Sequence, residues 1–145
     1  MYPFYLELEL LKPVSDFFQK KGFKVMHEIR IGFCRADLVA FKDDKTVAVE
    51  LKLSDWKKAI IQMKNYQLGS DYVYLGVPLS KSYNIIKKAE HILRKEGIGL
   101  LVVNEKNSDV KKIIHPKKSK KNMGSIKLDE IKRKRRRNYN KKRYF

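Results

Sequence analysis

The stretch of residues 35–52 constrains the fold of this chain more than any other. It reads RADLVAFKDDKTVAVELK, two runs rich in β-branched and apolar residues on either side of a short polar turn at Asp43 and Asp44. Such a pattern is typical of a β-hairpin. If Lys42 pairs with Lys45 across the turn, the alternation of side chains along each strand sorts the residues onto two faces.

The two faces of this predicted hairpin differ in character. On the apolar face Ala36 lies opposite Leu51, Leu38 opposite Val49 and Ala40 opposite Val47, and on the other face Phe41 lies opposite Thr46, Val39 opposite Ala48, Asp37 opposite Glu50 and Arg35 opposite Lys52. A slip of one residue would put charges on the apolar face, so the pattern supports this register.

Two carboxylates face each other in this register. Asp37 and Glu50 would have Cβ atoms roughly 4.5–5.5 Å apart, a separation at which like charges destabilise a sheet unless something neutralises them. A divalent cation is the natural candidate, and Lys52 points to the same side. The alternative is the solvent-facing side of an ordinary hairpin. Two observations argue against this alternative. Val39 and Ala48 share the face, so it becomes charged only towards one end, as at the rim of a buried sheet, and a helix that could cover it follows directly.

The remaining apolar periodicities predict an α/β architecture. A strand-helix-strand connection after the hairpin implies a parallel crossover, so we expect a mixed sheet flanked by helices. Pro13 lacks a backbone donor, so the first helix either kinks or begins there. The expected elements are a helix over residues 4–21, a strand over 24–31, the hairpin, a helix over 54–68, a strand over 72–77, a helix over 82–95 and a strand over 100–103.

Three further polar side chains lie on or beside the predicted apolar stripes of the helices. Glu7 shares the stripe of the first helix with Leu10 and Val14. A charge on such a stripe needs a reason, unless the residue is simply exposed in the first turn. Gln62 and Tyr66 lie one turn apart at the edge of the next helix's stripe, within reach of the strand ends. A polar flank beside a core tyrosine is the alternative for this pair.

The hairpin carries a resemblance to a known superfamily. Asp37, followed after twelve intervening residues by Glu50-Leu51-Lys52, resembles the signature of the PD-(D/E)XK nucleases, which share the restriction-endonuclease-like fold. Ala36 stands where the proline of that signature would be. In addition, the segment QMKNY at residues 62–66 resembles the Q-x-x-x-Y element of RecB-like and archaeal repair nucleases. The resemblance covers residues 4–103 and does not extend to the C-terminal segment.

The resemblance implies an αβββαβ core and metal-dependent hydrolysis of DNA phosphodiester bonds, in DNA repair, recombination or restriction. Mg²⁺ or Mn²⁺ would be the cofactor, because hard cations take oxygen ligands. Lys52 would orient or deprotonate the attacking water. The implied catalytic residues are Asp37, Glu50, Lys52 and Gln62, and the implied metal ligands are Asp37, Glu50, the Leu51 carbonyl and Glu7, with Tyr66 in support.

Charge is distributed unevenly along the chain. The net charge is +18, and residues 104–145 hold 17 Lys or Arg against 4 Asp or Glu. Such basic segments usually act as interaction tails, so a polyanion, most simply DNA, is the expected partner. A solubility tail is the alternative, and an anionic membrane is disfavoured because the segment shows no apolar face. The predicted nucleic-acid contacts are Lys132, Arg133, Lys134, Arg135, Arg136 and Arg137.

Length and cysteine content indicate the domain organisation and the cellular location of the protein. With 145 residues we expect one core over residues 1–103 and a flexible basic tail over residues 104–145. A single cysteine, no apolar run long enough for a membrane span and no signal-peptide pattern favour a cytoplasmic protein, nucleoid-associated in a prokaryote. Duplex cleavage would fit a homodimer. A non-catalytic protein that binds DNA or RNA on a nuclease-like fold is the alternative function.

Overall fold

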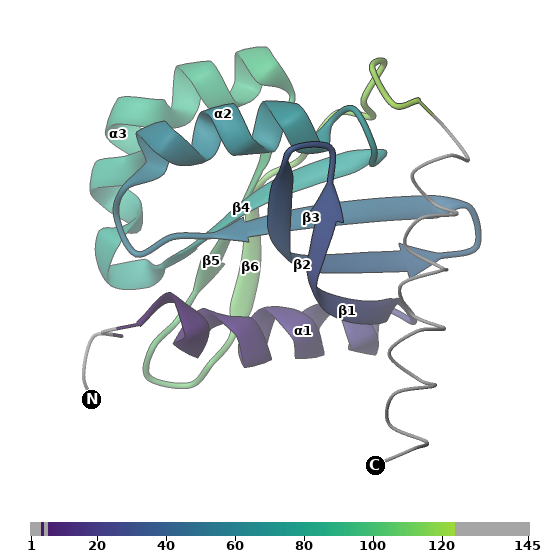
Figure 1. Cartoon of the computed structure of the whole chain (residues 1–145). Coiled ribbons are helices and arrows are strands. Elements are labelled where there is room, and N and C mark those ends of the chain that lie inside the picture. Colours follow the sequence, from purple (N-terminus) through teal and green to yellow (C-terminus); the bar gives the residue numbers. More distant parts are fainter. Residues whose placement is uncertain (1–3, 5, 124–145) are drawn as a thin grey trace.

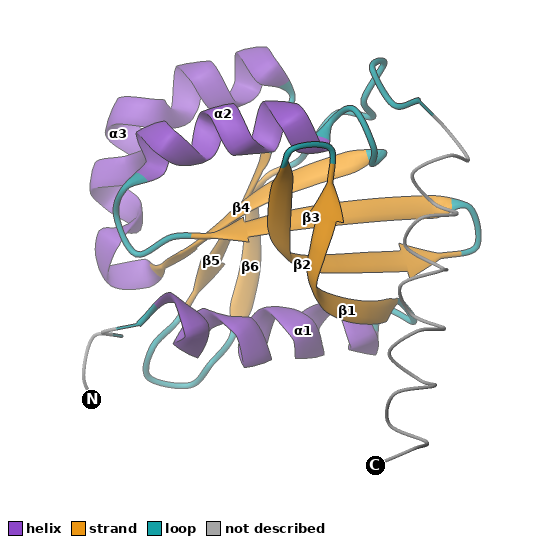
Figure 2. Ribbon diagram, viewed as in Figure 1, coloured by secondary structure: helices purple, strands orange, loops and turns teal. Residues whose placement is uncertain are grey.

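The computed structural model describes residue 4 and residues 6–123 of the chain (Figure 1). Helices lie on both sides of a central sheet (Figure 2). In chain order the elements are a 3-10 helix η1 (Glu7–Leu10), α1 (Leu11–Lys20), β1 (Lys24–Ile31), β2 (Cys34–Lys42), β3 (Lys45–Leu51), α2 (Trp56–Tyr66), β4 (Tyr72–Pro78), α3 (Leu79–Glu96), β5 (Gly99–Val103) and β6 (Val110–Ile114).

Within the described residues the sheet has six strands, which follow one another in sequence order from β1 to β6. Strands β1, β2 and β3 pair antiparallel, β3, β4 and β5 pair parallel, and β6 returns antiparallel beside β5. The mixed α/β sheet expected from the sequence is therefore confirmed. Lys42 pairs with Lys45 as predicted, and the expected register holds from there to Leu38 opposite Val49.

Each face of the sheet is buried under a different helical layer (Figure 1). On one face α1 packs Leu10, Val14 and Phe18 against the side chains that the hairpin was expected to bury, such as Leu38 and Val49. On the other face α2 and α3 form a second core over the side chains that alternate with them. That core includes Val39, Ala48, Ala59, Met63, Tyr66, Ile85 and Leu93. Burial on both sides explains why the central strands read as nearly continuous apolar runs.

The first helix begins later than the range of residues 4–21 suggested. A 3-10 helix covers Glu7–Leu10, and α1 starts at Leu11 with Pro13 in its first turn. A proline is tolerated there because the first-turn N–H groups have no partner within the helix. The alternative in which the helix really begins near Pro13 is thus the one observed. The third helix also differs from its predicted range of residues 82–95. Helix α3 starts at Leu79, directly after β4, and ends at Glu96, so it is longer than predicted.

The β1–β2 hairpin bends at the level of Asp37. Strand pairing is interrupted where Glu28 lies opposite Asp37, between the pairs His27–Leu38 and Ile29–Ala36. At this point the backbone of Glu28 is left-handed, with a φ of 53°. Beyond this point the hairpin curls towards α2 (Figure 1). The predicted place of Ala36 on the α1 face is therefore wrong: Ala36 is buried in the core beneath α2 and α3.

The ordered core extends beyond residue 103, where the sequence placed its boundary. Strand β6 pairs with β5 and buries Ile114. After β6 the chain stays attached to the core, since Ser119 N donates to the Asp71 carbonyl and Met123 N donates to the Leu68 carbonyl. The prediction failed because β6 reads VKKII, whose two lysines resemble the basic segment around it. The predicted contacts over residues 132–137 lie outside the described residues.

Within residues 6–123, no helix is both long enough and apolar enough to cross a bilayer.

Candidate active site

The site predicted from the hairpin lies where β2 and β3 diverge. Asp37 is near the start of β2, Glu50 is near the end of β3, and Lys52 follows directly. Regular pairing between the two strands ends one position earlier, at Leu38 and Val49. In place of a further ladder bond, the Leu51 N–H donates to Asp37 Oδ2 over 2.8 Å. The aspartate thus takes over the role of a backbone acceptor and is fixed in position.

Glu50 is the most buried charged group of the site, with 4% of its surface exposed. Its Oε1 lies 2.7 Å from the Tyr66 hydroxyl, and its Oε2 lies 3.6 Å from Lys52 Nζ. Burial first, and then repulsion from Asp37, raise the pKa of Glu50 to about 7, although Tyr66 and Lys52 act in the opposite direction. Glu50 therefore changes its charge near neutral pH.

Asp37 shares this environment. Burial is the main cause that raises the pKa of Asp37, and the Glu7 carboxylate contributes in the same direction. The Leu51 N–H and the Lys52 ammonium oppose the rise. The two predicted carboxylates thus interact, as their placement on opposed strands required. Two acids with raised pKa values at one point of a sheet are typical of functional sites rather than of a solvent-facing strand.

Tyr66 connects the site to the hairpin. Its hydroxyl lies 2.6 Å from the Arg35 carbonyl oxygen as well as 2.7 Å from Glu50 Oε1. A phenol has one hydrogen to donate. The hydroxyl hydrogen is therefore shared between the Arg35 carbonyl and the Glu50 carboxylate. Its share in the bond to Glu50 stabilises the charged carboxylate and opposes the rise in the pKa of Glu50. Burial, followed by the contact with Glu50, raises the pKa of Tyr66, so the phenol stays protonated.

Gln62 lies one turn before Tyr66 on the same face of α2. Its Oε1 atom is buried and has no hydrogen-bond partner among the described residues. A buried amide oxygen without a partner costs free energy, on the order of 1–3 kcal/mol. Such an atom in a native structure usually has a partner that is not protein, such as water, an ion or a substrate group. Gln62 is therefore available for a ligand at this side of the sheet.

Glu7 lies at the rim of the site. Its Oε2 accepts a hydrogen bond from the Leu53 N–H over 3.3 Å, and Glu7 itself is exposed. The described residues contain no group of three His, Cys, Asp or Glu side chains placed to hold a metal ion together. The charge of Glu7 nevertheless acts on Asp37. Its role as a metal ligand stays a prediction.

The groups present suit a hard divalent cation. Asp37 and Glu50 supply two carboxylates whose mutual repulsion a cation would relieve, and the Leu51 carbonyl lies between Glu50 and Lys52 in the chain. Mg²⁺ commonly uses one or two carboxylates and keeps several waters, so it does not need three acidic ligands. On the helix that carries Tyr66, Gln62 also offers a buried Oε1 atom without a partner among the described residues. The residues therefore fit a Mg²⁺ or Mn²⁺ site.

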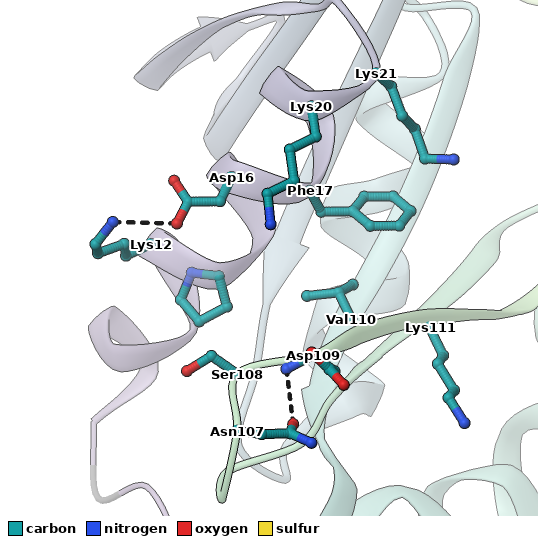
Figure 3. A pocket seen from close by; sticks show the side chains of 11 residues that line it. Lys12, Asp16, Phe17, Lys20, Lys21, Asn107, Ser108, Asp109, Val110 and Lys111 are labelled. Carbon is teal, nitrogen blue, oxygen red and sulfur yellow. Dashed lines mark hydrogen bonds and ion pairs between the residues drawn. The ribbon is translucent and has the colours of Figure 1, made fainter.

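A hollow of about 570 Å³ lies elsewhere, between α1 and the turn that joins β5 to β6 (Figure 3). Asp16 is engaged there in an ion pair with Lys12 at 3.1 Å. None of the predicted site residues lines this hollow. Its lining residues are Lys12, Pro13, Asp16, Phe17, Lys20, Lys21, Asn107, Ser108, Asp109, Val110 and Lys111. It is a basic surface depression beside the α1 core, and the paired carboxylates lie apart from it.

The structure brings in one residue that sequence reasoning missed. Asn65 donates from Nδ2 to the Ile31 carbonyl over 2.6 Å and accepts from the Phe33 N–H over 3.3 Å. Through these bonds α2 holds the turn between β1 and β2. In the sequence Asn65 is only a polar residue next to Tyr66. Its partners, Ile31 and Phe33, come within reach because the β1–β2 hairpin curls towards α2.

The structure is thus an open mixed α/β sheet that carries a pair of interacting carboxylates, and comparison with known proteins agrees at the level of the fold. No family model and no curated protein sequence matches the chain. Among the solved structures that match it is a XisH family protein from Nostoc punctiforme PCC 73102, with a TM-score of 0.56 and 17% identity over 74% of this chain and 97% of that one.

A second similar structure is an FdxN element excision controlling factor protein from Anabaena variabilis. It has a TM-score of 0.53 and 21% identity over 72% of this chain and 95% of that one. Proteins of this kind have a restriction-endonuclease-like fold. At these identities the likeness concerns the fold.

Proposed function

We propose that this chain is a metal-dependent nuclease of the PD-(D/E)XK type that hydrolyses DNA phosphodiester bonds. The observation that carries the proposal is the meeting of Asp37 and Glu50 at the divergence of β2 and β3, with the Lys52 ammonium 3.6 Å from Glu50. Repulsion within a partly buried acid pair is relieved by a divalent cation.

The roles of the residues follow from their positions. Asp37 and Glu50, with the Leu51 carbonyl, would hold Mg²⁺ or Mn²⁺. When bound, such a cation supplies Lewis-acid polarisation of the scissile phosphate. Asp37 is already fixed by the Leu51 N–H, so its other carboxylate oxygen is oriented before substrate arrives. Tyr66 keeps the Glu50 carboxyl group in place from the opposite side.

Lys52 is the chain's own source of positive charge at the site. Its side chain is 19% exposed, so the ammonium can reach a phosphate while remaining beside Glu50. There it would offset the growing negative charge on the phosphate and orient the attacking water. Gln62, with an unpartnered buried oxygen, would accept a hydrogen bond from that water or from Lys52.

Charge outside the site fits a polyanionic substrate. The net charge of +18 would give largely sequence-independent affinity for DNA. If six to ten phosphates are neutralised, that affinity falls by roughly three to five decades between 50 and 200 mM salt. The description of one structural neighbour as an element excision controlling factor is compatible with a DNA substrate. DNA repair, recombination and restriction are the settings that such an activity would serve.

The test is incubation with single-stranded, nicked, flapped and branched DNA in the presence of Mg²⁺ or Mn²⁺. Asp37→Ala and Glu50→Ala should abolish cleavage, and Lys52→Ala should remove turnover while DNA binding is retained. Asp44→Ala and Lys45→Ala are the matched controls, because they remove the same charges at the exposed turn of the same hairpin. Cleavage that survives in both Asp37→Ala and Glu50→Ala would exclude this site.

A non-catalytic nucleic-acid-binding protein is the second candidate. The observation in its favour is the excess of basic residues over residues 104–145, which does not depend on the carboxylates. It predicts salt-sensitive binding that is indifferent to Asp37 and Glu50, together with no metal uptake in calorimetry. Competition between DNA and RNA probes would show which nucleic acid is preferred.

A further inference from the structure

The turn between β1 and β2 presents an aromatic ring to solvent. Phe33 is 89% exposed and follows Gly32 in a two-residue turn. A single exposed apolar residue needs no explanation by itself. Phe33 differs because the groups around it are charged, rigidly placed and connected to the candidate active site.

Two arginines lie on the strands that lead into and out of this turn. Arg30 and Arg35 are directly opposed across β1 and β2, and both are exposed. Like charges in opposed positions destabilise a hairpin unless an anion lies between or beside them. Arg30 Nε also donates to the Gly32 carbonyl over 3.3 Å, which draws its guanidinium towards the turn. Two arginines on the strands next to a turn that carries an exposed ring match a phosphate backbone with a base attached to it.

The turn is held in place rather than free to move. Asn65 of α2 bonds to the backbone of both Ile31 and Phe33, on either side of Gly32. A Cβ atom at Gly32 would lie 2.5 Å from Asn65 Oδ1, so this close approach requires glycine. Gly32 also has a φ of 61°. A ring carried on a fixed turn loses less conformational entropy on binding than one on a mobile loop.

The same turn is connected to the candidate active site. The carbonyl of Arg35 and Glu50 Oε1 are the two acceptors within reach of the Tyr66 hydroxyl. Phe33, in the turn directly before β2, precedes Asp37 by four residues, which spans about 13 Å of extended chain. At about 3.4 Å per nucleotide along one strand of a duplex, this distance corresponds to about four nucleotides.

We infer that the β1–β2 turn is a base-stacking platform that selects DNA with unpaired bases beside the cleavage site. This inference rests on the proposed nuclease function. Phe33 stacks on an unpaired base within about four nucleotides of the scissile phosphate. Arg30 and Arg35 bind the neighbouring phosphates. In an intact duplex the faces of the bases are covered by their neighbours, so the ring reaches only single strands, flaps, frayed ends or junctions.

The experiment measures binding in EDTA, where no cleavage occurs, at 200 mM salt to weaken non-specific contacts. Single strands, flaps and blunt duplexes carry 2-aminopurine, whose fluorescence reports stacking. Phe33→Ala should weaken binding to the single strand and the flap by about 5- to 150-fold, the range that corresponds to one stacked base. It should also remove the fluorescence quench and leave duplex binding unchanged. Phe33→Tyr should restore both signals.

Tyr83→Ala is the matched control, because Tyr83 is an exposed aromatic residue on α3 with 73% of its surface accessible. Equal affinity of wild type and Phe33→Ala for every probe overturns the inference. So does a change of oligomeric state in Phe33→Ala, measured by analytical ultracentrifugation, which would mean that a second copy covers the ring. Loss of stacking in Phe33→Ala combined with no cleavage by wild type would reject the nuclease function and retain the platform.

Discussion

Tyr66 and Glu50 form a 2.7 Å contact between the last residue of α2 and the penultimate residue of β3. The contact lies inside the core, where Tyr66 has no exposed surface and Glu50 has 4%. It ties the helix that covers the sheet to the carboxylate that would hold a metal ion. Because the hydroxyl also reaches the Arg35 carbonyl, one phenol links three separate elements.

Replacing Tyr66 by phenylalanine should therefore affect both stability and titration. Removal of the hydroxyl leaves the Arg35 carbonyl and Glu50 without this partner, which should lower the free energy of unfolding by about 1–3 kcal/mol. The Tyr66 hydrogen bond counteracts the rise in the pKa of Glu50. In Tyr66→Phe that pKa should therefore exceed 7. Urea denaturation and an NMR titration of the carboxyl carbons measure the two effects.

Tyr74→Phe is the control for this change. Tyr74 is a buried tyrosine on the other face of the sheet, packed with Phe18 beneath α1. Its replacement should leave the Glu50 titration unchanged. If Tyr66→Phe and Tyr74→Phe shift the titration equally, the 2.7 Å contact does not control the charge of Glu50.

The raised pKa of Glu50 also predicts how stability depends on pH in the metal-free protein. Between the ordinary value of 4.5 and the native value of about 7, the native state binds more protons at Glu50 than the unfolded state. The free energy of unfolding should therefore fall as pH rises through this window, by up to about 3 kcal/mol for this group. The loss is complete above the native pKa.

Glu50→Gln removes this contribution. The difference in unfolding free energy between wild type and Glu50→Gln, measured in EDTA from pH 4 to pH 8.5, should favour the variant increasingly as pH rises. Glu90→Gln, which removes a negative charge from the surface of α3, controls for the change in net charge. A wild-type minus Glu50→Gln difference that is flat with pH contradicts the assignment of the raised pKa to Glu50.

Divalent cations should reverse the same destabilisation. Binding to the native state alone stabilises a protein by an amount that grows with ligand concentration, so Mn²⁺ at about 100 times its dissociation constant should add about 2.7 kcal/mol. Thermal unfolding and calorimetry measure this effect at pH 7.5. Asp37→Asn and Glu50→Gln should each abolish it, whereas Asp44→Asn should not. Stabilisation by Mn²⁺ that is retained in both site variants would place the ion elsewhere.

The parts of the site that the sequence revealed are those that follow from strand alternation. The spacing of Asp37 and Glu50 in a hairpin with a short turn placed them at one point, and the register from Lys42 to Leu38 agrees with the structure. The curl of the neighbouring β1–β2 hairpin could not be predicted from the sequence. It depends on the left-handed backbone of Glu28 and on hydrogen bonds from Asn65. Both are tertiary effects that hydrophobic periodicity does not record.

The end of the core was misplaced for a related reason. A strand at the edge of a sheet exposes one face, so β6 carries lysines at positions 111 and 112 and has the composition of the basic segment around it. Edge strands commonly carry such charges. Its identity as a strand depends on pairing with β5, which only the three-dimensional structure supplies.

Two truncations would separate the ordered core from the basic segment. A chain that ends at Met123 keeps β6 and the backbone bond from Met123 to Leu68, so it should fold with an unchanged melting temperature. It loses ten Lys or Arg residues, so its affinity for DNA should fall and its salt dependence should become shallower. A chain that ends at Val103 exposes the edge of β5 and removes the buried Ile114, so it should aggregate or unfold. Circular dichroism and fluorescence anisotropy measure these outcomes. If the chain that ends at Val103 folds stably, β6 is not part of the core. If the chain that ends at Met123 binds DNA as tightly as the full chain, residues 132–137 are not among the DNA contacts.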